Sequence, residues 1–405
     1  MAAKENIRKY CGLMVCLAVL SVVCSCGKKT VYPMNQLDTP DHHVYAGLKL
    51  LDLGKYDDAR RAFRMASKTD PDCSKAYSGM ALVDIVAGNP DMALGNLDLG
   101  LKKAKSDEDK LFAHTAKIRY FISNRSDPHW LELSRKQYDE AVAINPRYAP
   151  VYYYMGLAYK EALNFDLAEQ MFRSVLDQKT EHVSDAKQQL DFLLKLKSVK
   201  PESLLGAKIA LRDRMTRADF AALLVEELKI KEICKRQANE PSPPETKIEA
   251  PKNISPGVLP EQERSQVVVL AQTSAKARDI ADHPLRKEIE EILEIGINGL
   301  QVDSRGNFRP DEIISRGELA VSLEDIMTKV TGEKDLAAVY VSSKSLFPDV
   351  PSDMPYFKSI IAVASQDVMQ AKDPATREFA PLKPVSGLEA LSIVDKLKKK
   401  LKVNR

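Results

Sequence analysis

Two short stretches of the sequence each place an arginine where its charge is unfavourable for a helix. ISRGELAVSL begins at Ile314, and MTRADFAALL begins at Met215. In each, a hydroxyl residue and an acidic residue three positions later have the spacing of a capping box, whose side chains accept hydrogen bonds from free amides at a helix start. The arginine then falls in the first helical turn, where the dipole disfavours a cation by up to about 1 kcal/mol.

This arrangement has a possible chemical use. A guanidinium fork beside free helix amides is suited to bind a carboxylate. The residues concerned are Thr216, Arg217 and Asp219 in the first stretch and Ser315, Arg316 and Glu318 in the second. Two structural alternatives remain open, because such Ser, Thr, Asp and Glu residues serve as helix caps, each contributing roughly 1 kcal/mol, and an exposed arginine is simply solvated.

The second stretch belongs to a repeat with a single offset. Each of seven positions recurs 71 residues later, pairing Ile289, Ile292, Gly296, Phe308, Pro310, Ser315 and Glu318 with Ile360, Val363, Asp367, Phe379, Pro381, Ser386 and Glu389. Each unit is predicted to contain an acidic opening, an amphipathic helix, a turn ending in F-x-P and a capped second helix. The later copy keeps its cap at Ser386 but has Gly387 in place of arginine.

A third copy lies upstream, interrupted by extra sequence. Thr216 precedes Ser315 by 99 residues, and a polar, proline-rich stretch from Lys235 to Gln262 supplies the additional 28. Its composition predicts a disordered linker over residues 235–265. The helix expected from Ser184 to Lys197 would be shared between this copy and the preceding part of the chain. The opening half of the copy lacks the F-x-P signature and has Ile209 at the position of Phe308.

These three units resemble the S-layer homology (SLH) module, with its FxDV opening, its F-x-P turn and its T-R-x-E cap. The resemblance implies three units around a pseudo-threefold axis, with the Arg of each T-R-x-E motif facing a groove that binds a pyruvylated cell-wall polysaccharide. It would make Arg217, Arg316, Thr216, Asp219, Ser315 and Glu318 glycan-binding residues. Because the third unit lacks the arginine, at most two such sites are expected. The glycan could also be peptidoglycan or another polymer.

An earlier part of the chain repeats at a different period. Ala46, Gly47, Leu50, Ala59, Phe63, Ala66 and Pro71 have the spacing of a tetratricopeptide (TPR) unit, as do Tyr152, Met155, Gly156, Tyr159, Ala168 and Phe172. Gly47 and Gly156 are three periods of 34 plus seven residues apart, and the surplus is assigned to a longer turn near Ser123 to Pro128. The resemblance implies a solenoid with a concave surface for a protein or peptide. Tyr152, Tyr153 and Tyr154 could line that surface, with at least one buried and one exposed.

The N-terminus has the pattern of a targeting segment. Lys4, Arg8 and Lys9 precede an apolar run from Leu13 to Val23, which is too short to span a bilayer. The following residues resemble a bacterial lipobox, with Cys26 as the lipidated residue, and a plain secretory peptide is the alternative. The position after Cys26 is occupied by Gly27 rather than Asp, which resembles the pattern of lipoproteins that are sent to an outer membrane. We therefore expect membrane anchoring through an N-terminal lipid, in a bacterial envelope and facing the periplasm.

The remaining sequence argues against several functions. Lys plus Arg total 60 against 57 Asp plus Glu, a balance that gives no support to nucleic acid as a partner. Cys73 and Cys234 lack metal spacing and are expected to be structural. Ser184 and Lys187 have the S-x-x-K spacing of penicillin-binding enzymes, but no K-T-G or S-x-N motif follows. Asp303 to Glu312 does not fit the EF-hand calcium loop, and His42 and His43 have no third residue with which to bind a metal. No cofactor, metal site or catalytic constellation is predicted.

The predicted architecture is all-α, a TPR-type solenoid followed by an SLH-type bundle with a disordered insertion. The expected segments are a lipoprotein signal peptide (1–26), a polar spacer (27–41), a TPR solenoid (42–182), an atypical first SLH unit (183–234), the linker, and two SLH units (277–331 and 345–400). The predicted function is a non-catalytic tether or scaffold that binds cell-wall glycan and a protein. The alternatives are a pilotin-like assembly factor for an outer-membrane or pilus machine, with a purely structural SLH part, and a wall-modifying enzyme.

Overall fold

The computed structural model describes residues 38–239, 277–331 and 345–401. Within these ranges every regular element is a helix, and only three isolated β-bridges occur, which agrees with the predicted all-α class. Cys26 and the expected signal segment lie outside the described residues. The first residues of the predicted linker, 235–239, belong to a helix instead, and the rest of it lies outside the described residues.

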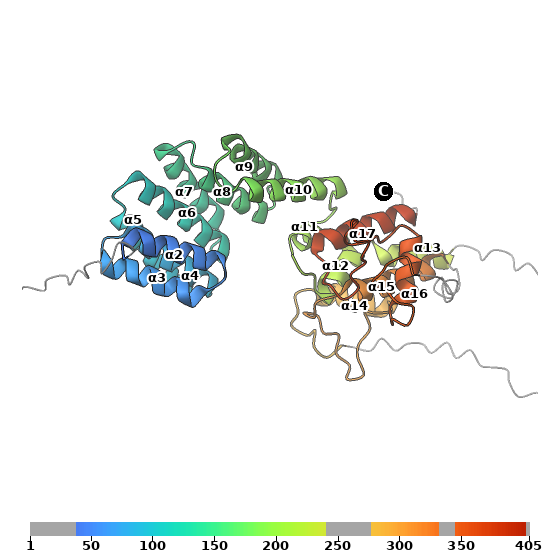
Figure 1. Cartoon of the computed structure of the whole chain (residues 1–405). Coiled ribbons are helices and arrows are strands. Elements are labelled where there is room, and N and C mark those ends of the chain that lie inside the picture. Colours follow the sequence, from blue (N-terminus) through green and yellow to red (C-terminus); the bar gives the residue numbers. More distant parts are fainter. Residues whose placement is uncertain (1–37, 240–276, 332–344, 402–405) are drawn as a thin grey trace, which may run out of the picture. The chain divides into compact units, whose positions relative to one another are not determined.

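The described residues divide into two compact units between Leu190 and Asp191. The first contains four helical hairpins (Figure 1). The helices pair as α2 (Pro40–Asp52) with α3 (Tyr56–Thr69), α4 (Ser74–Val86) with α5 (Pro90–Lys103), α6 (Asp107–Ser123) with α7 (Trp130–Ile144), and α8 (Ala149–Glu161) with α9 (Phe165–Gln178).

Small residues let the helices of a hairpin approach closely. A Cβ atom added at Gly47 would lie 2.6 Å from the ring of Phe63, and one added at Gly156 would lie 2.6 Å from the ring of Phe172. Both phenylalanines are fully buried, as is Ala59. The positions that suggested a tetratricopeptide spacing therefore form the contacts that close each hairpin.

The seven surplus residues are shared between a helix and a turn. Helix α6 has 17 residues, whereas α2, α4 and α8 have 13 each. Six residues separate α6 from α7, whereas three separate the paired helices of each other hairpin. The sequence prediction placed the insertion in the correct hairpin but assigned all of it to the turn.

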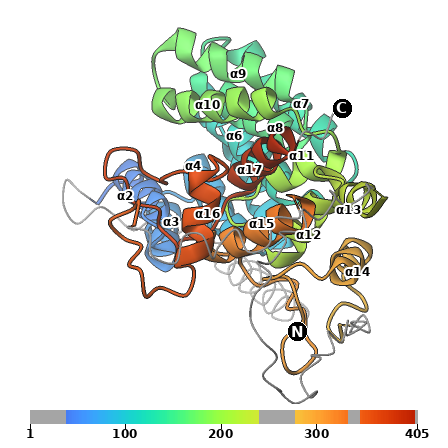
Figure 2. The ribbon, with the colours of Figure 1, turned by 90° about the vertical axis from the view of Figure 1, so that its right-hand side faces the viewer.

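The first helices of the hairpins form the inner face of the solenoid. The first helix of each hairpin packs against the first helix of the following hairpin: α2 against α4, α4 against α6, and α6 against α8. Among the described helices, α3, α5 and α7 pack instead against the first helix of the following hairpin. Closer spacing along one row bends the stack toward that row, so α2, α4, α6 and α8 line its concave side (Figures 1 and 2).

Helix α10 (Val183–Val199) contains the division between the two units. The second unit continues with α11 (Leu204–Ala210), α12 (Arg217–Glu226), α13 (Ile230–Asn239), α14 (Arg286–Ile295), α15 (Arg316–Thr331), α16 (Phe357–Ser365) and α17 (Gly387–Lys400). Its core is apolar and contains the buried rings of Phe220, Phe308, Phe357 and Phe379.

Three equivalent segments meet in a closed ring of backbone hydrogen bonds. The amide of Met215 donates to the carbonyl of Val385 (2.8 Å), that of Val385 donates to Ile314 (3.2 Å), and that of Ile314 donates to Met215 (3.1 Å). Each of these residues lies just before the start of α12, α15 or α17. The three units therefore close around a pseudo-threefold axis within a single chain.

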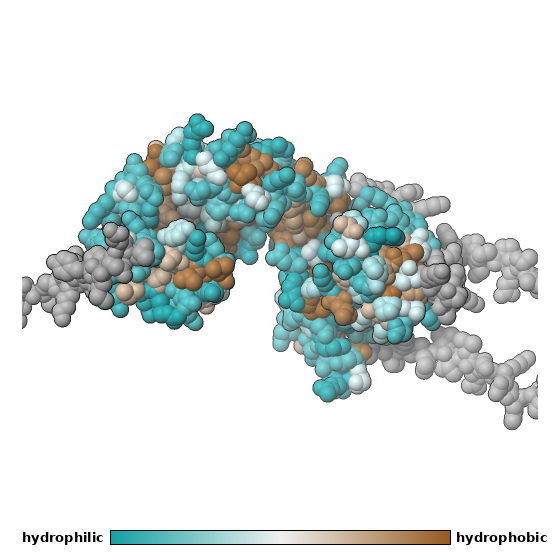
Figure 3. Space-filling view, in the orientation of Figure 1, coloured by the Kyte–Doolittle hydropathy of each residue, from teal (hydrophilic) through white to brown (hydrophobic). Residues whose placement is uncertain are grey.

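The face of each unit that Figure 3 shows is mainly hydrophilic. On the face that Figure 3 shows, apolar residues appear as small patches between charged and polar ones. Within the described ranges, no helix is both long enough and apolar enough to cross a membrane.

Candidate functional site

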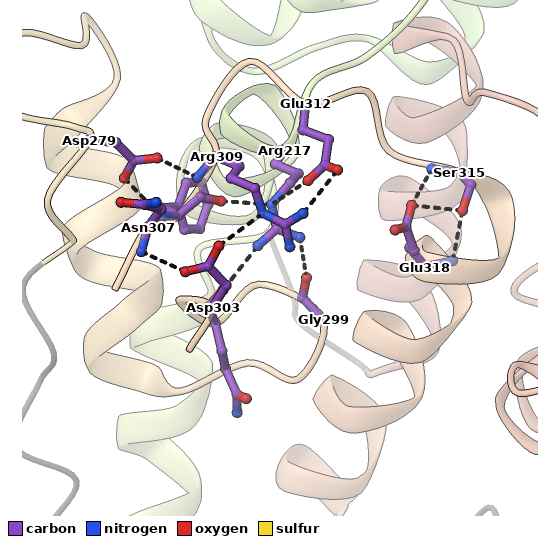
Figure 4. Close-up of polar contacts among 11 residues, drawn as sticks. Arg217, Asp279, Gly299, Asp303, Asn307, Arg309, Glu312, Ser315 and Glu318 are labelled. Atoms are coloured by element: carbon purple, nitrogen blue, oxygen red, sulfur yellow. Dashed lines mark hydrogen bonds and ion pairs between the residues drawn. The ribbon is translucent and has the colours of Figure 1, made fainter. Parts of the chain in front are cut away.

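The two predicted capping boxes are present. The amide of Asp219 donates to the Thr216 hydroxyl (3.1 Å), and the amide of Thr216 donates to the Asp219 carboxylate (3.0 Å). Ser315 and Glu318 repeat this exchange, with the Ser315 amide donating to Glu318 at 2.8 Å and the Glu318 amide to the Ser315 hydroxyl at 3.3 Å (Figure 4). These four side chains cap helices α12 and α15.

Arg217 is buried and bonded to the next unit. Its guanidinium donates three hydrogen bonds to backbone carbonyls, those of Phe308 (2.9 Å), Gly299 (2.6 Å) and Gln301 (3.1 Å). The group also lies 4.9 Å from the centre of the Phe308 ring. Burial lowers the pKa of Arg217 from its ordinary value. Figure 4 shows this side chain directed into the turn of the neighbouring unit.

Arg316 repeats the arrangement in the following unit. Its guanidinium donates to the carbonyls of Phe379 (2.6 Å) and Gln370 (2.7 Å), pairs with Glu389, and lies 4.5 Å from the centre of the Phe379 ring. Only 3% of the residue is exposed. Burial lowers the pKa of Arg316 to about 10.

Neither arginine therefore faces outward with a free guanidinium group, as the sequence prediction expected. The helix amides are engaged too: Arg217 and Ala218 donate to the carbonyls of Glu312 (2.8 Å) and Pro310 (3.0 Å), and Arg316 donates to Lys383 (3.0 Å). We correct the prediction accordingly. The guanidinium groups and the amides that could have formed an anion site are used to join consecutive units.

Gly387, which stands where Arg217 and Arg316 stand in the other two repeats, has different surroundings because the first repeat lacks the F-x-P turn. Gly387 donates its amide to the carbonyl of Arg212 (2.8 Å), and a Cβ atom at this position would lie 1.7 Å from the carbonyl oxygen of Ile209. The backbone of α11 thus occupies the space that a side chain would need. The absence of an arginine here follows from the packing of α11.

The acidic residue that opens each of the last two units holds the F-x-P turn. Asp279 accepts the amides of Phe308 (2.8 Å) and Arg309 (2.7 Å), and Asp349 accepts those of Phe379 (2.8 Å) and Ala380 (2.7 Å). The residue after each phenylalanine is left-handed, with φ of 57° at Arg309 and 58° at Ala380. The carboxylate fixes this unfavourable conformation, so the shared FxD and F-x-P signals have one structural cause.

Among the cavities in the described part of the second unit, three lie near these helix starts and helix α17. One lies beside α11 and residues 278–285 and is lined in part by Thr216 and Asp219. The second lies beside the start of α17 and is lined in part by Arg316 and Glu389. The third lies beside the end of α17 and is lined in part by Glu227 and Lys398. The sequence reasoning missed the lysines around the second cavity, because they lie outside the repeated motif.

The three consecutive tyrosines of α8 pack mainly against neighbouring helices and loops. The Tyr152 hydroxyl donates to the carbonyl of Pro146 (2.8 Å), Tyr153 stacks on His182 with ring centres 4.4 Å apart, and Tyr154 faces Arg119. All three are partly buried, so the expectation of one buried and one exposed tyrosine is wrong. Burial raises the pKa of Tyr153 to about 12.

Arg119 is a cation on the inner face of the solenoid. It projects from α6, and its guanidinium lies 4.8 Å from the centre of the Tyr154 ring on α8. It takes part in no ion pair with another described residue. Its nitrogen atoms are therefore available to acceptors on a bound molecule, while the guanidinium group lies over the aromatic ring.

Other sequence features have no chemical partner within the described residues. No group of three or more His, Cys, Asp or Glu side chains there is arranged to hold a metal ion. His43 pairs with Asp38 at 2.7 Å, and His42 lies beside it. Cys73 and Cys234 are free thiols, and burial raises the pKa of each.

Comparison with known proteins gives one local sequence similarity. The chain is 27% identical over 139 residues to tetratricopeptide repeat protein 6 of Homo sapiens, covering 34% of this chain. It spans about a quarter of that relative's length. No family model matches the chain. Together with the hairpin geometry, the local similarity supports a TPR-type repeat array.

Solved structures show partial likeness. A thermophilic TPR protein of Thermus thermophilus is 22% identical and superposes with a TM-score of 0.35, covering 49% of this chain and 97% of its own. Pseudomonas aeruginosa pilF is 15% identical with a TM-score of 0.22, covering 41% and 93% respectively. TM-scores this low carry no functional argument for this chain.

Proposed function

We propose that this chain is a non-catalytic scaffold whose solenoid binds a protein partner and whose second unit is a closed structural bundle. A TPR-type array suits protein–protein interaction, because its stacked first helices present one extended surface. This proposal corresponds to the assembly-factor alternative drawn from the sequence. It also includes lipid anchoring at Cys26 in a bacterial outer membrane, facing the periplasm.

The observation that carries the protein-binding role is the Arg119 and Tyr154 pair on the inner face. The two residues come from neighbouring hairpins, so a ligand that contacts both would bridge α6 and α8. A guanidinium stacked on a ring is already oriented and loses little further freedom on binding. Arginine and tyrosine are also the residue types most often found at the centres of protein interfaces.

A photo-crosslinking experiment tests this role. A photoreactive amino acid replaces Lys160, on the inner row of helices, or exposed Lys136, on the outer helix α7, in the full chain expressed in its own cell. We expect one protein to be crosslinked from Lys160, not from Lys136, and to be lost when Arg119→Ala is added. Equal labelling from both positions would reject the inner face as the binding surface.

A second candidate function is a glycan tether. It is favoured by one observation, the pseudo-threefold closure of three units in one chain, which is the architecture that the SLH resemblance implies. Because Arg217 and Arg316 are buried and bonded between units, they are not suitable residues for testing glycan contact. Lys208 is exposed and lines the cavity beside α11, so it offers a better position.

Sedimentation with purified sacculi distinguishes the two candidates. If the bundle binds glycan through that cavity, the purified chain should co-sediment with sacculi and Lys208→Glu should reduce the bound fraction several-fold. The exposed Lys287→Glu on α14 is the matched control, because its charge change is the same and it does not line the cavity. If the bundle is purely structural, none of the three chains will co-sediment.

The proposed anchor has its own test. Metabolic labelling with an alkyne analogue of palmitate should mark the chain in its native cell, and Cys26→Ser should abolish the label. The label should fractionate with outer-membrane rather than inner-membrane vesicles. A Cys26→Ser chain that keeps the label would place the lipid at another residue, and an unlabelled parent chain would favour a plain secretory peptide.

A further inference from the structure

The three cavities of the second unit differ in charge. The one beside the start of α17 has a volume of about 450 Å³ and is lined by five cationic side chains against two acidic ones. We call it the basic cavity. Its cations come from three separate parts of the unit and comprise Lys195, Arg212, Arg316, Lys372 and Lys396.

One of the two acidic side chains is already neutralised. Glu389 accepts hydrogen bonds from both Arg316 and Lys372 through its two oxygens. Lys195 and Lys396 form no ion pair with another described residue, and both are exposed. The basic cavity therefore keeps an excess of positive charge after its internal pairs are formed.

The electrostatic surroundings of Lys372 agree with this excess. The pKa of Lys372 is lowered, first by burial and then by repulsion from Arg316, Lys383 and Lys195, although the side chain pairs with Glu389. Of these three cations, Arg316 is paired with Glu389, whereas Lys195 and Lys383 form no ion pair with another described residue and still lie close enough to act on Lys372. A bound anion would relieve that repulsion.

The start of α17 adds to the same field. This 14-residue helix begins at Gly387, and Ser386 and Leu388 in its first turn line the basic cavity. The N-terminus of a helix carries partial positive charge. Because the Gly387 amide donates to Arg212 and the Glu389 amide to the Ser386 hydroxyl (3.3 Å), this helix start contributes its dipole rather than donors from these two amides. The helix terminus and the lysines thus favour the same sign of ligand.

We propose that the basic cavity binds a phosphate group. A lysine ammonium group binds phosphate as a compact point charge, and a phosphate monoester can balance more cationic charge than one carboxylate can. Here three lysines line the cavity, Arg316 is used inside the bundle, and Arg212 lies 3.5 Å from Asp219. A phosphate monoester of charge near −2 matches this set better than a single carboxylate.

The cavity beside α11 provides an internal comparison. It is larger, about 710 Å³, but Lys208, Arg212 and Arg278 there face four acidic residues, Asp219, Asp279, Asp282 and Asp311. The third cavity has equal numbers of both signs, and Lys398 there bonds Glu202 at 2.9 Å. Among these three cavities, the charge excess thus belongs to the basic cavity alone.

Titration with inorganic phosphate tests the proposal on the chain from Gly27 onward, which retains every described residue. Binding is followed by calorimetry at fixed ionic strength and pH 8, with acetate as the carboxylate probe. We expect saturable phosphate binding with acetate at least tenfold weaker. The double variant Lys195→Gln, Lys396→Gln should weaken phosphate binding at least tenfold. Lys287→Gln, at an exposed position on α14 that lines none of the three cavities, should leave it unchanged.

The results that would overturn the proposal are equally specific. They are acetate binding as tight as phosphate, unchanged affinity in the double variant, or the absence of saturable binding. Thermal unfolding of each variant checks that lost binding does not come from lost folding. Lys195 and Lys396 are exposed and form no ion pair with another described residue. The double variant should therefore unfold at the temperature of the parent chain.

The source of the phosphate group is resolved by two further probes. Vesicles containing phosphatidic acid, compared with neutral phosphatidylcholine vesicles, test a lipid headgroup, and soluble glycerol phosphate tests a free ester. Vesicle binding that the double variant loses identifies the headgroup. Binding of the soluble ester alone identifies a soluble or sugar-linked phosphate, and failure of both probes counts against the proposal. None of these readouts depends on the protein partner of the solenoid.

Discussion

At the scale of single residues, Arg217 and Arg316 show how a locally unfavourable choice becomes useful between repeats. Each begins a helix whose dipole opposes its charge, at a cost of up to about 1 kcal/mol. Each also donates to carbonyl groups of the following repeat, three for Arg217 and two for Arg316, and in each set one acceptor belongs to a buried phenylalanine, Phe308 or Phe379. An unsatisfied buried carbonyl costs about 1–3 kcal/mol, so the bonds outweigh the dipole term.

This reasoning predicts the effect of Arg217→Ala. The change leaves the carbonyls of Phe308, Gly299 and Gln301 without their donor, and it removes the contact with the Phe308 ring. We expect the second unit to lose about 3–5 kcal/mol of stability. Urea unfolding followed by circular dichroism measures the loss. Exposed Arg305→Ala is the control, with an expected change within about 0.5 kcal/mol.

Gly387 gives a complementary prediction, because a side chain there is excluded by backbone. In Gly387→Ala the new Cβ would meet the carbonyl oxygen of Ile209, and α11 or α17 would have to move. We expect a loss of more than about 2 kcal/mol. Gly95→Ala, in α5, meets nothing within 4 Å and should stabilise the chain by about 0.5–1 kcal/mol. Similar midpoints for both variants would refute this account of the third position.

The sequence predicted the caps but not the acceptors of the arginines. A capping box lies within four residues, so its spacing is visible in the sequence. Gly299 lies 82 positions after Arg217 and offers only a backbone carbonyl, which every residue has. The resemblance to a glycan-binding module also favoured a bound glycan, rather than a neighbouring repeat, as the partner of the two guanidinium groups. One sequence signal pointed to these acceptors. The third repeat has Gly387 in place of the arginine, and the first repeat, against which it packs, lacks the F-x-P turn that accepts the other two arginines.

At the scale of helices, repeat spacing predicted which residues close each hairpin and where a repeat is longer. It could not divide the seven extra residues between α6 and the turn after it. Helix length depends on how far the neighbouring helices continue to offer apolar contacts, and Tyr120 near the end of α6 packs in the core shared with α4. Such contacts, rather than local propensity, decide where a helix ends.

Helix α8 gives a prediction about pH. Burial raises the pKa of Tyr153 to about 12, while the same phenol in the unfolded chain titrates near 10. The folded state therefore holds this proton more tightly. The stability that this provides is present below pH 10 and is lost as the pH rises toward 12.

Comparison of the parent chain with Tyr153→Phe tests this linkage. Because phenylalanine has no proton to lose, the variant should lose less stability between pH 9 and pH 11 than the parent chain. Urea midpoints at the two pH values provide the measurement. Exposed Tyr45→Phe is the control and should follow the parent chain. Identical pH dependence of the parent and Tyr153→Phe chains would show that this phenol is not held in the protonated form.

At the scale of the whole molecule, the second unit is a ring that its last helix closes. Helix α17 packs against α11 and α12, the Gly387 amide bonds the carbonyl of Arg212, and Lys398 bonds the carbonyl of Glu227 (2.8 Å). The closing contacts join residues separated by more than 170 positions. A ring of this kind is expected to unfold as one cooperative block, unlike a solenoid, whose repeats contact only their neighbours.

Removal of residues 387–405 tests that difference. Without α17, the buried faces of α11 and α12 are exposed, and the Arg212 carbonyl loses the Gly387 amide. We expect hydrogen exchange to become fast throughout residues 204–239 and 277–331, including α15, which lies far from the deletion in sequence. Amides of α2 to α9 should keep their protection, because the four hairpins contain their own core. Protection that persists in α14 and α15 would show that the units are stable without closure, and the ring of backbone bonds would then be a consequence of their packing rather than a condition for it.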